Sequence, residues 1–161
     1  MKPDKHDFER TIFGGVAATL IVTALMYLAQ LVPALPNIDM AAALGYPLSG
    51  HSAVQFSVAW WVGLIVFFVV GGVLSPLIFV YAYGGLMGRP WLRGVEWAVF
   101  LWVVGGVGVM TGMGLGFNEG HAAHPVMSVA ATLVAHVIYG AVLGQIAGSA
   151  LAHPEQRSAA A

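Results

Sequence analysis

One histidine in the middle of a charge-free stretch has the clearest chemical potential in the sequence. His136 lies near the centre of residues 125–149, PVMSVAATLVAHVIYGAVLGQIAGS, which contain no Asp, Glu, Lys or Arg. Ionisable side chains in such apolar segments are functional hypotheses by default. A neutral imidazole can ligate haem iron or contact a quinone carbonyl. The alternatives are a structural hydrogen bond to a neighbouring helix and proton transfer.

The positions of the other histidines determine whether a second haem ligand is available. A b-type haem held by two histidines needs a second histidine at similar depth on another helix. The remaining histidines lie at the ends of the apolar runs or outside them: His6, His51, His121, His124 and His153. We therefore expect His136 to be a structural residue and the chain to bind no cofactor alone, with haem b or quinone contact as the alternative.

A second group of ligand-type side chains lies in the loop at 114–124. Glu119, His121 and His124 lie within six residues of one another. Carboxylate and imidazole bind zinc or copper, and histidines at i and i+3 can converge on one ion. Because the HxxH spacing fixes no third ligand, a hydrated loop with two histidines is the alternative to a metal site.

The composition excludes several classes of function. The sequence shows no nucleophile–base pair, phosphate-binding loop or paired buried carboxylates, and it has no cysteine. We therefore expect a protein that is not an enzyme. The formal net charge of −1 argues against nucleic acid as a partner.

The elements that position these residues are membrane spans. The 161 residues are 59% hydrophobic and 8% charged, whereas soluble domains are about 25% charged. About 20 apolar residues cross the hydrocarbon core of a bilayer. We expect an all-α integral membrane four-helix bundle in one domain, residues 1–161, and its predicted spans are about 11–32, 57–85, 91–113 and 125–149.

The second span is the ambiguous one, because residues 52–86 are charge-free over 35 positions. Gly71, Gly72 and Pro76 mark a kink inside it. We prefer one bent span to two, since two would separate the positive charges. In the preceding loop, Asn37 or Asp39 is expected to cap a short interfacial helix that ends near Gly45.

The positive charges predict the orientation. Lys and Arg occur only in the N-terminal segment, the turn at 86–94 and the C-terminal tail. Cytoplasmic loops carry the excess of Lys and Arg. Four spans with both termini in the cytoplasm place every positive charge on one side.

Glycines at helical spacing predict where helices approach closely. Gly140, Gly144 and Gly148 continue a small or polar stripe on the fourth span, and Gly108 and Gly112 form a second set on the third. Small residues let backbones approach in membranes. Among the tryptophans, Trp60, Trp61 and Trp91 are expected to be interfacial anchors, and Trp97 and Trp102 to face lipid or a partner.

Several segments resemble a widespread family of small four-span bacterial membrane proteins of unknown function. They are GGVAATLIVTALMYL with LPNIDMAAALG, WLRG with MTGMGLGF, and PVMSVAATLVAHVIYGAVLG, which centres on His136 and Tyr139. The second span departs from the family pattern, because AWWVGLIVFFVVGG stands where a histidine is expected. The resemblance implies a four-helix bundle in the bacterial inner membrane and brings no established activity.

These observations favour a non-catalytic subunit of a larger membrane complex, such as a respiratory or other electron-transfer assembly. The chain has little mass outside its spans and several glycine-lined faces that suit helix partners. The alternatives are a haem- or quinone-binding protein that uses His136, and a small-solute channel or transporter.

The predicted orientation can be tested with alkaline phosphatase fusions, which are active only outside the cytoplasm. Fusions after Ser49 and Gly120 should be active, and fusions after Gly88 and Ala161 inactive, because the positive charges hold the latter segments inside. An active fusion after Gly88 would contradict the four-span topology.

Overall fold

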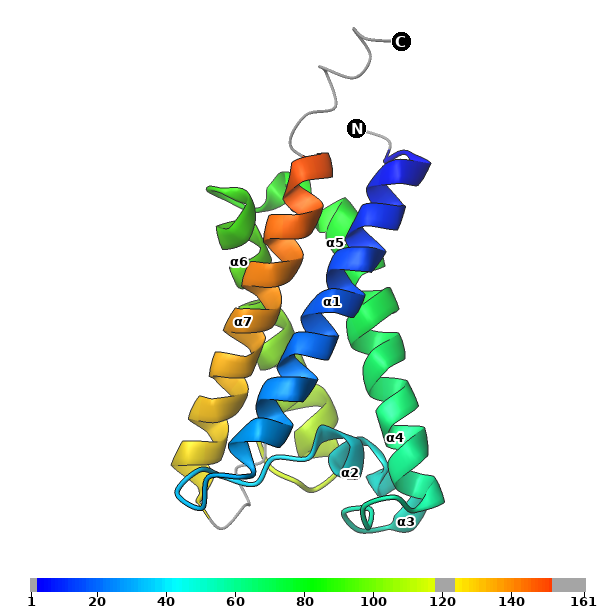
Figure 1. The fold of residues 1–161 in the computed structure, drawn as a ribbon, viewed down its shortest axis with the longest axis vertical. Coiled ribbons are helices and arrows are strands. Elements are labelled where there is room, and N and C mark those ends of the chain that lie inside the picture. The colour runs from blue at the N-terminus through cyan, green and yellow to red at the C-terminus, as the bar shows by residue number, and fades with distance from the viewer. Residues whose placement is uncertain (1–2, 118–123, 152–161) are drawn as a thin grey trace, which may run out of the picture.

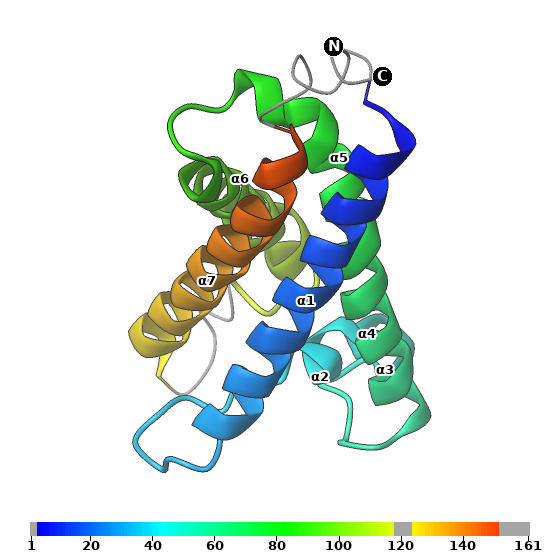
Figure 2. The same cartoon turned by 45° about the horizontal axis from the view of Figure 1, so that its top comes forward.

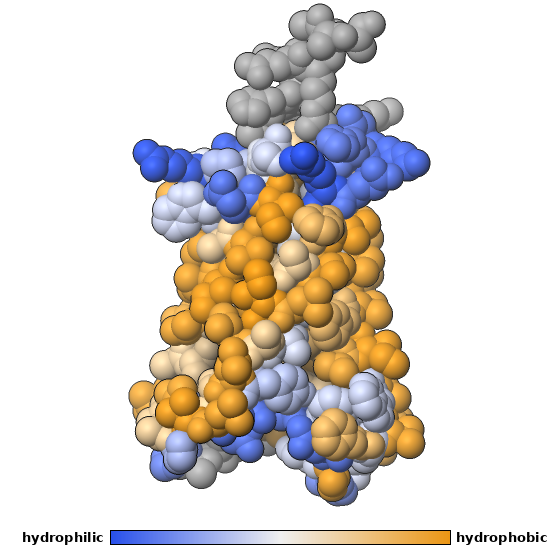
Figure 3. All heavy atoms as spheres, in the orientation of Figure 1, coloured by the Kyte–Doolittle hydropathy of each residue, from blue (hydrophilic) through white to orange (hydrophobic). Residues whose placement is uncertain are grey.

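The computed structural model describes residues 3–117 and 124–151, and within them four helical segments are long and apolar enough to cross a membrane. They are Lys5–Ala29, Val58–Gly85, Pro90–Met110 and Pro125–Leu151. This confirms the predicted all-α fold with four spans. On the face drawn in Figure 3, apolar residues cover most of the side of the bundle, and polar residues gather mainly at its ends.

The first span, helix α1 (Lys5–Ala29), begins ahead of the predicted start at Thr11. Asp4 and Asp7 form a reciprocal capping box, in which each carboxylate accepts a hydrogen bond from the other residue's backbone N–H, at 2.9 and 3.1 Å. Two orphan N–H groups are thereby satisfied. The helix therefore extends through the charged N-terminal segment.

The second span is one bent helical path. It comprises α4 (Val58–Val69), the π-helix η1 (Val70–Leu74), α5 (Ser75–Ala82) and the 3₁₀ turn η2 (Tyr83–Gly85). The Ser57 hydroxyl caps α4 by accepting from the Trp60 N–H at 3.3 Å. The predicted kink coincides with η1, which contains two adjacent glycines.

The remaining spans are α6 (Pro90–Val104), continued by the π-helix η3 (Gly105–Met110), and α7 (Pro125–Leu151). Helix α7 packs against both α6 and α1, and α1 packs against η1 and α5. Figures 1 and 2 show this order of helices in both views. Helices α1 and α4 diverge toward the end of the bundle that lies away from the two termini (Figure 1).

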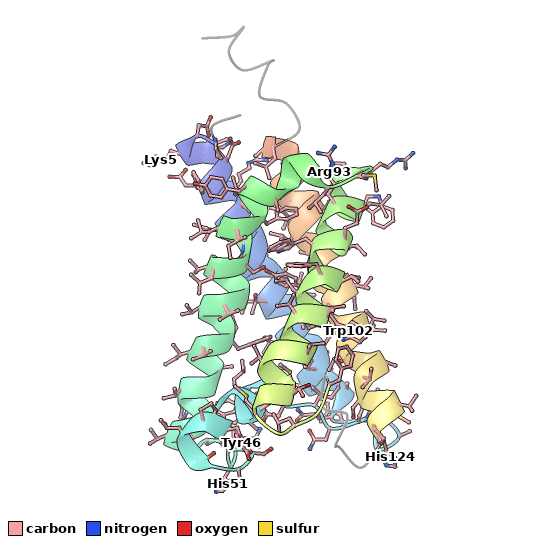
Figure 4. All side chains as sticks on the ribbon, turned by 180° about the vertical axis from the view of Figure 1, so that it is seen from behind. Lys5, Tyr46, His51, Arg93, Trp102 and His124 are labelled. Carbon is pink, nitrogen blue, oxygen red and sulfur yellow. The ribbon has the colours of Figure 1, made fainter. Side chains whose placement is uncertain are left out.

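The start of α1 and the end of α7 lie at the same end of the bundle, where the Arg10 guanidinium donates to the Ser149 hydroxyl at 2.6 Å. Figure 4 shows Lys5 and Arg93 at this end, and Tyr46, His51 and His124 at the opposite end. The predicted outer loops contain no Lys or Arg. Positive charge is therefore segregated to one end of the described molecule.

The first of these loops contains α2 (Met40–Leu44) and α3 (Tyr46–Ser49). Asp39 caps α2 by accepting from the Ala42 N–H at 3.0 Å, and Gly45 ends it. Helix α2 packs closely against α4. The loop is thus part of the bundle at this end.

Two tryptophan predictions are wrong. Trp60 is only 4% exposed and donates its indole N–H to the Asp39 carboxylate at 2.8 Å. Trp97 is 7% exposed, so it lies inside the bundle and not against lipid. The indole of Trp60 finds a half-buried carboxylate and that of Trp97 the buried Ser75 hydroxyl, acceptors that periodicity alone does not reveal.

Candidate functional site

A buried polar junction joins three spans near the centre of the bundle. The Tyr139 hydroxyl on α7 donates to the Gly71 carbonyl oxygen at 2.6 Å, and it lies 3.1 Å from the Ser75 hydroxyl. The Trp97 indole N–H on α6 donates to the same Ser75 oxygen at 3.0 Å. Side chains from α6 and α7 thus converge on the second span where η1 meets α5.

The π-helix explains why Gly71 needs this partner. A single π-turn inserts one extra residue and disturbs the regular i to i+4 hydrogen bonds, so a carbonyl is left to find another donor. Inside a membrane no water is present to supply one. The Tyr139 hydroxyl fills that role.

The sequence carries a signal for these π-helices that the periodicity analysis missed. The pentapeptide VVGGV occurs twice, at 69–73 and at 103–107, and both copies coincide with a π-helix. In the second copy, the Gly106 carbonyl accepts from the Thr111 hydroxyl of the same helix at 2.8 Å. The carbonyl in the first π-helix is therefore satisfied by another helix, and the one in the second π-helix by its own helix.

His136 is half-buried on α7, and its Nδ1 lies 2.8 Å from the Thr132 carbonyl oxygen. A carbonyl only accepts, so Nδ1 carries the hydrogen and the neutral ring keeps its lone pair on Nε2. Nε2 makes no hydrogen bond to another described residue. The expected hydrogen bond from His136 to a neighbouring helix is wrong for the described residues, because the bond stays within α7.

Thr132, whose carbonyl binds His136, also makes hydrogen bonds through its side chain. Its hydroxyl accepts from the Trp102 indole N–H at 3.1 Å and donates to the Val129 carbonyl at 2.9 Å. Trp102, like Trp97, is therefore tied to a partner helix within the chain. Its ring also contacts Phe117 edge-on, with centroids 4.8 Å apart.

The candidate metal ligands are only partly described. Glu119 and His121 lie outside the described residues, and His124 is exposed at the end opposite Lys5 (Figure 4). Within 3–117 and 124–151, no three His, Cys, Asp or Glu side chains gather as a metal site. His51 and His124 both lie at the end of the bundle opposite Lys5 (Figure 4). His136 lies near the middle of α7, so neither of them shares its depth.

The glycines of α7 lie where this helix meets α6. A methyl group added to Gly140 would lie 2.3 Å from the Gly94 carbonyl oxygen, and one added to Gly144 would lie 2.4 Å from that of Pro90. A methyl group on Gly148 would lie 2.2 Å from the Pro90 ring. The two backbones are therefore in direct contact.

The glycines of the third span behave differently. Gly108 and Gly112 are exposed, and a methyl group on either would meet no atom of residues 3–117 and 124–151 within 4 Å. Gly105 has the same open surroundings. The expected packing of Gly108 and Gly112 against another helix does not occur within the described chain.

These features can be set beside known proteins. The chain matches the sequence model of a family of unknown function, DUF6789, over residues 6–158. The chain belongs to the DUF6789 family. No curated protein and no solved structure matches it. The family assignment confirms the resemblance to a small four-span membrane family of unknown function.

One cavity of this DUF6789 protein lies between α1, α2 and α4. Thr23, Tyr27, Asp39 and Phe67 are among its lining residues, and its volume of about 10 Å³ corresponds to about one water molecule. It is too small for a porphyrin or a quinone ring. A cofactor at His136 would therefore need a surface outside this cavity.

Proposed function

We propose that this DUF6789 protein is a non-catalytic subunit of a larger membrane assembly in the bacterial inner membrane, with both termini in the cytoplasm. The orientation is supported by the segregation of Lys5, Arg10, Arg89 and Arg93 to one end of the bundle. The apolar sides of the four long helices support a lipid environment (Figure 3).

The contrast between two sets of glycines carries this proposal. Gly94, Gly140 and Gly144 admit another backbone within the chain. Gly108 and Gly112 have the same four-residue spacing, yet no described residue lies within 4 Å of a methyl group placed on either. Glycine costs helix stability unless a close contact repays it. The open face at Gly108 in η3 and at Gly112 just beyond it therefore suits a helix of another subunit.

A respiratory or other electron-transfer assembly is the class we favour. The motive is the His136 imidazole, whose Nε2 lone pair lies within a span and has no hydrogen-bond partner in the described chain. Such a group suits an assembly in which a neighbouring subunit or its cofactor lies against α7.

The proposal can be tested by native mass measurement of the protein solubilised in mild detergent from its own membranes. Gly108→Leu and Gly112→Leu should shift the protein from a high-mass complex to its own mass, because leucine holds the partner backbone away. Ile65→Leu, at a 61% exposed site on α4, should leave the complex intact. A wild-type protein that runs at its own mass, or glycine variants that stay in the complex, would contradict the proposal.

The second candidate function is haem or quinol binding through His136. The described tautomer presents Nε2 as an acceptor, so it fits a haem iron or a quinol hydroxyl. It does not fit a quinone carbonyl, which also accepts. Since no second described histidine lies at this depth, this chain would supply one axial ligand at most.

His136→Gln separates the two candidates. In a structural role the variant loses little stability, since the His136 hydrogen bond lies within α7 and the glutamine amide can donate to the same Thr132 carbonyl. We expect that result, with unchanged haem absorption of the intact complex. Stoichiometric haem in the wild type that disappears in the variant would promote the second candidate, as would loss of quinol oxidation alone.

A further inference from the structure

The outer end of α4 is held by direct backbone contact with α2. A methyl group added to Gly63 would lie 2.0 Å from the Ala41 carbonyl oxygen, and one on Gly45 would lie 2.5 Å from that of Ala59. The hydrogen bond from Trp60 to Asp39 joins the same two elements. Figures 1 and 2 both show α2 beside α4. These contacts fix how α4 is rotated about its own axis.

The middle of this span is fixed by α1. A methyl group on Gly15 would lie 2.0 Å from the Pro76 ring and 2.9 Å from the Gly72 carbonyl oxygen. The start of α5 is therefore in close contact with α1. We call these two contacts clamps: α2 holds the second span at its outer end, and α1 holds it at its middle.

The π-helix η1 follows the α2 clamp along the chain, and the α1 clamp begins within it, at Gly72. A π-turn has poorer hydrogen bonds than an α-helix and usually persists only where the surroundings require it. In η1 the two clamps hold the flanking segments, and the Tyr139 hydroxyl satisfies the Gly71 carbonyl. The Ser75 N–H bonds the Val70 carbonyl in this turn, and if one clamp is released it can bond the Gly71 carbonyl instead, as in an α-helix.

We propose that α2 is a strap that holds the second span in its π-containing register, so that displacement of α2 at the outer surface is transmitted to the Tyr139 junction inside the membrane. Loss of one residue from the wide turn rotates the outer half of the span by about 100° and shifts it by about 1.5 Å. The Tyr139 hydroxyl then loses its acceptor. This device is independent of the proposed subunit role.

The forward direction of this coupling is tested with Gly63→Ala, whose methyl group must push α2 away. Because the chain has no cysteine, Val58→Cys and Val126→Cys give a unique pair of spin labels at sites 75% and 83% exposed. The distance distribution between the labels should shift by several ångströms in Gly63→Ala. Gly105→Ala, whose methyl group meets nothing, should leave it unchanged. An unchanged distribution in folded Gly63→Ala overturns the proposal.

If Gly63→Ala does not fold, Trp60→Phe provides the milder displacement. It removes the hydrogen bond to Asp39 and keeps an aromatic ring, with Trp61→Phe as the exposed neighbouring control. Trp60→Phe should broaden the distance distribution toward the released position, and Trp61→Phe should not. Identical distributions in both variants would overturn the proposal.

The reverse direction must hold as well, because coupling free energies are reciprocal. Tyr139→Phe removes the hydroxyl at the π-turn and should speed amide hydrogen exchange in Met40–Leu44 by roughly three- to tenfold, the range that one hydrogen bond supports. Tyr139 lies on α7, which packs against α6 and α1, whereas α2 packs against α4. A merely local effect of the lost hydroxyl would leave exchange in α2 unchanged, and that result would overturn the proposal.

Discussion

The direct contact between the backbones of α6 and α7 is the interaction on which the rest of the bundle depends. Lipid tails are as apolar as leucine, so membrane helices associate through close packing and hydrogen bonds. A methyl group on Gly94 would lie 1.9 Å from the Gly140 carbonyl oxygen, which shows how close the approach is. Tyr139 precedes Gly140 directly. The contact that seats α7 therefore also aims the Tyr139 hydroxyl at the second span.

Hydrogen-bond satisfaction is the second constraint. Within the described residues, every buried side-chain nitrogen or oxygen has a partner. The hydroxyls of Thr11, Thr19 and Thr23 all donate to carbonyls of their own helix, four residues earlier. The Tyr139 junction differs because its donors come from other helices. It can therefore link the packing of α6, α7 and η1, whereas the threonine bonds stabilise α1 alone.

The features that sequence predicts here are local or compositional. Four spans follow from charge-free length, and Asp39 as a cap of α2 follows from residue type. The features that the sequence does not predict depend on tertiary contact.

Gly108 and Gly144 lie in equally spaced glycine series, yet of these two only Gly144 meets another backbone. Burial of Trp97 likewise depends on Ser75, which the π-turn and the neighbouring helices bring into reach. For the candidate site, sequence indicated His136 but not the tautomer that its bond to Thr132 imposes.

A comparison of two alanine variants by reversible unfolding in detergent tests most directly whether backbone contact holds the bundle. Gly144→Ala should lower the free energy of unfolding by about 1–3 kcal/mol, as overpacking does, because its methyl group would lie 2.4 Å from the Pro90 carbonyl oxygen. Gly108→Ala should leave it unchanged or raise it slightly, since alanine favours a helix and the methyl group meets nothing. Equal stability of the two variants would contradict this account of the fold.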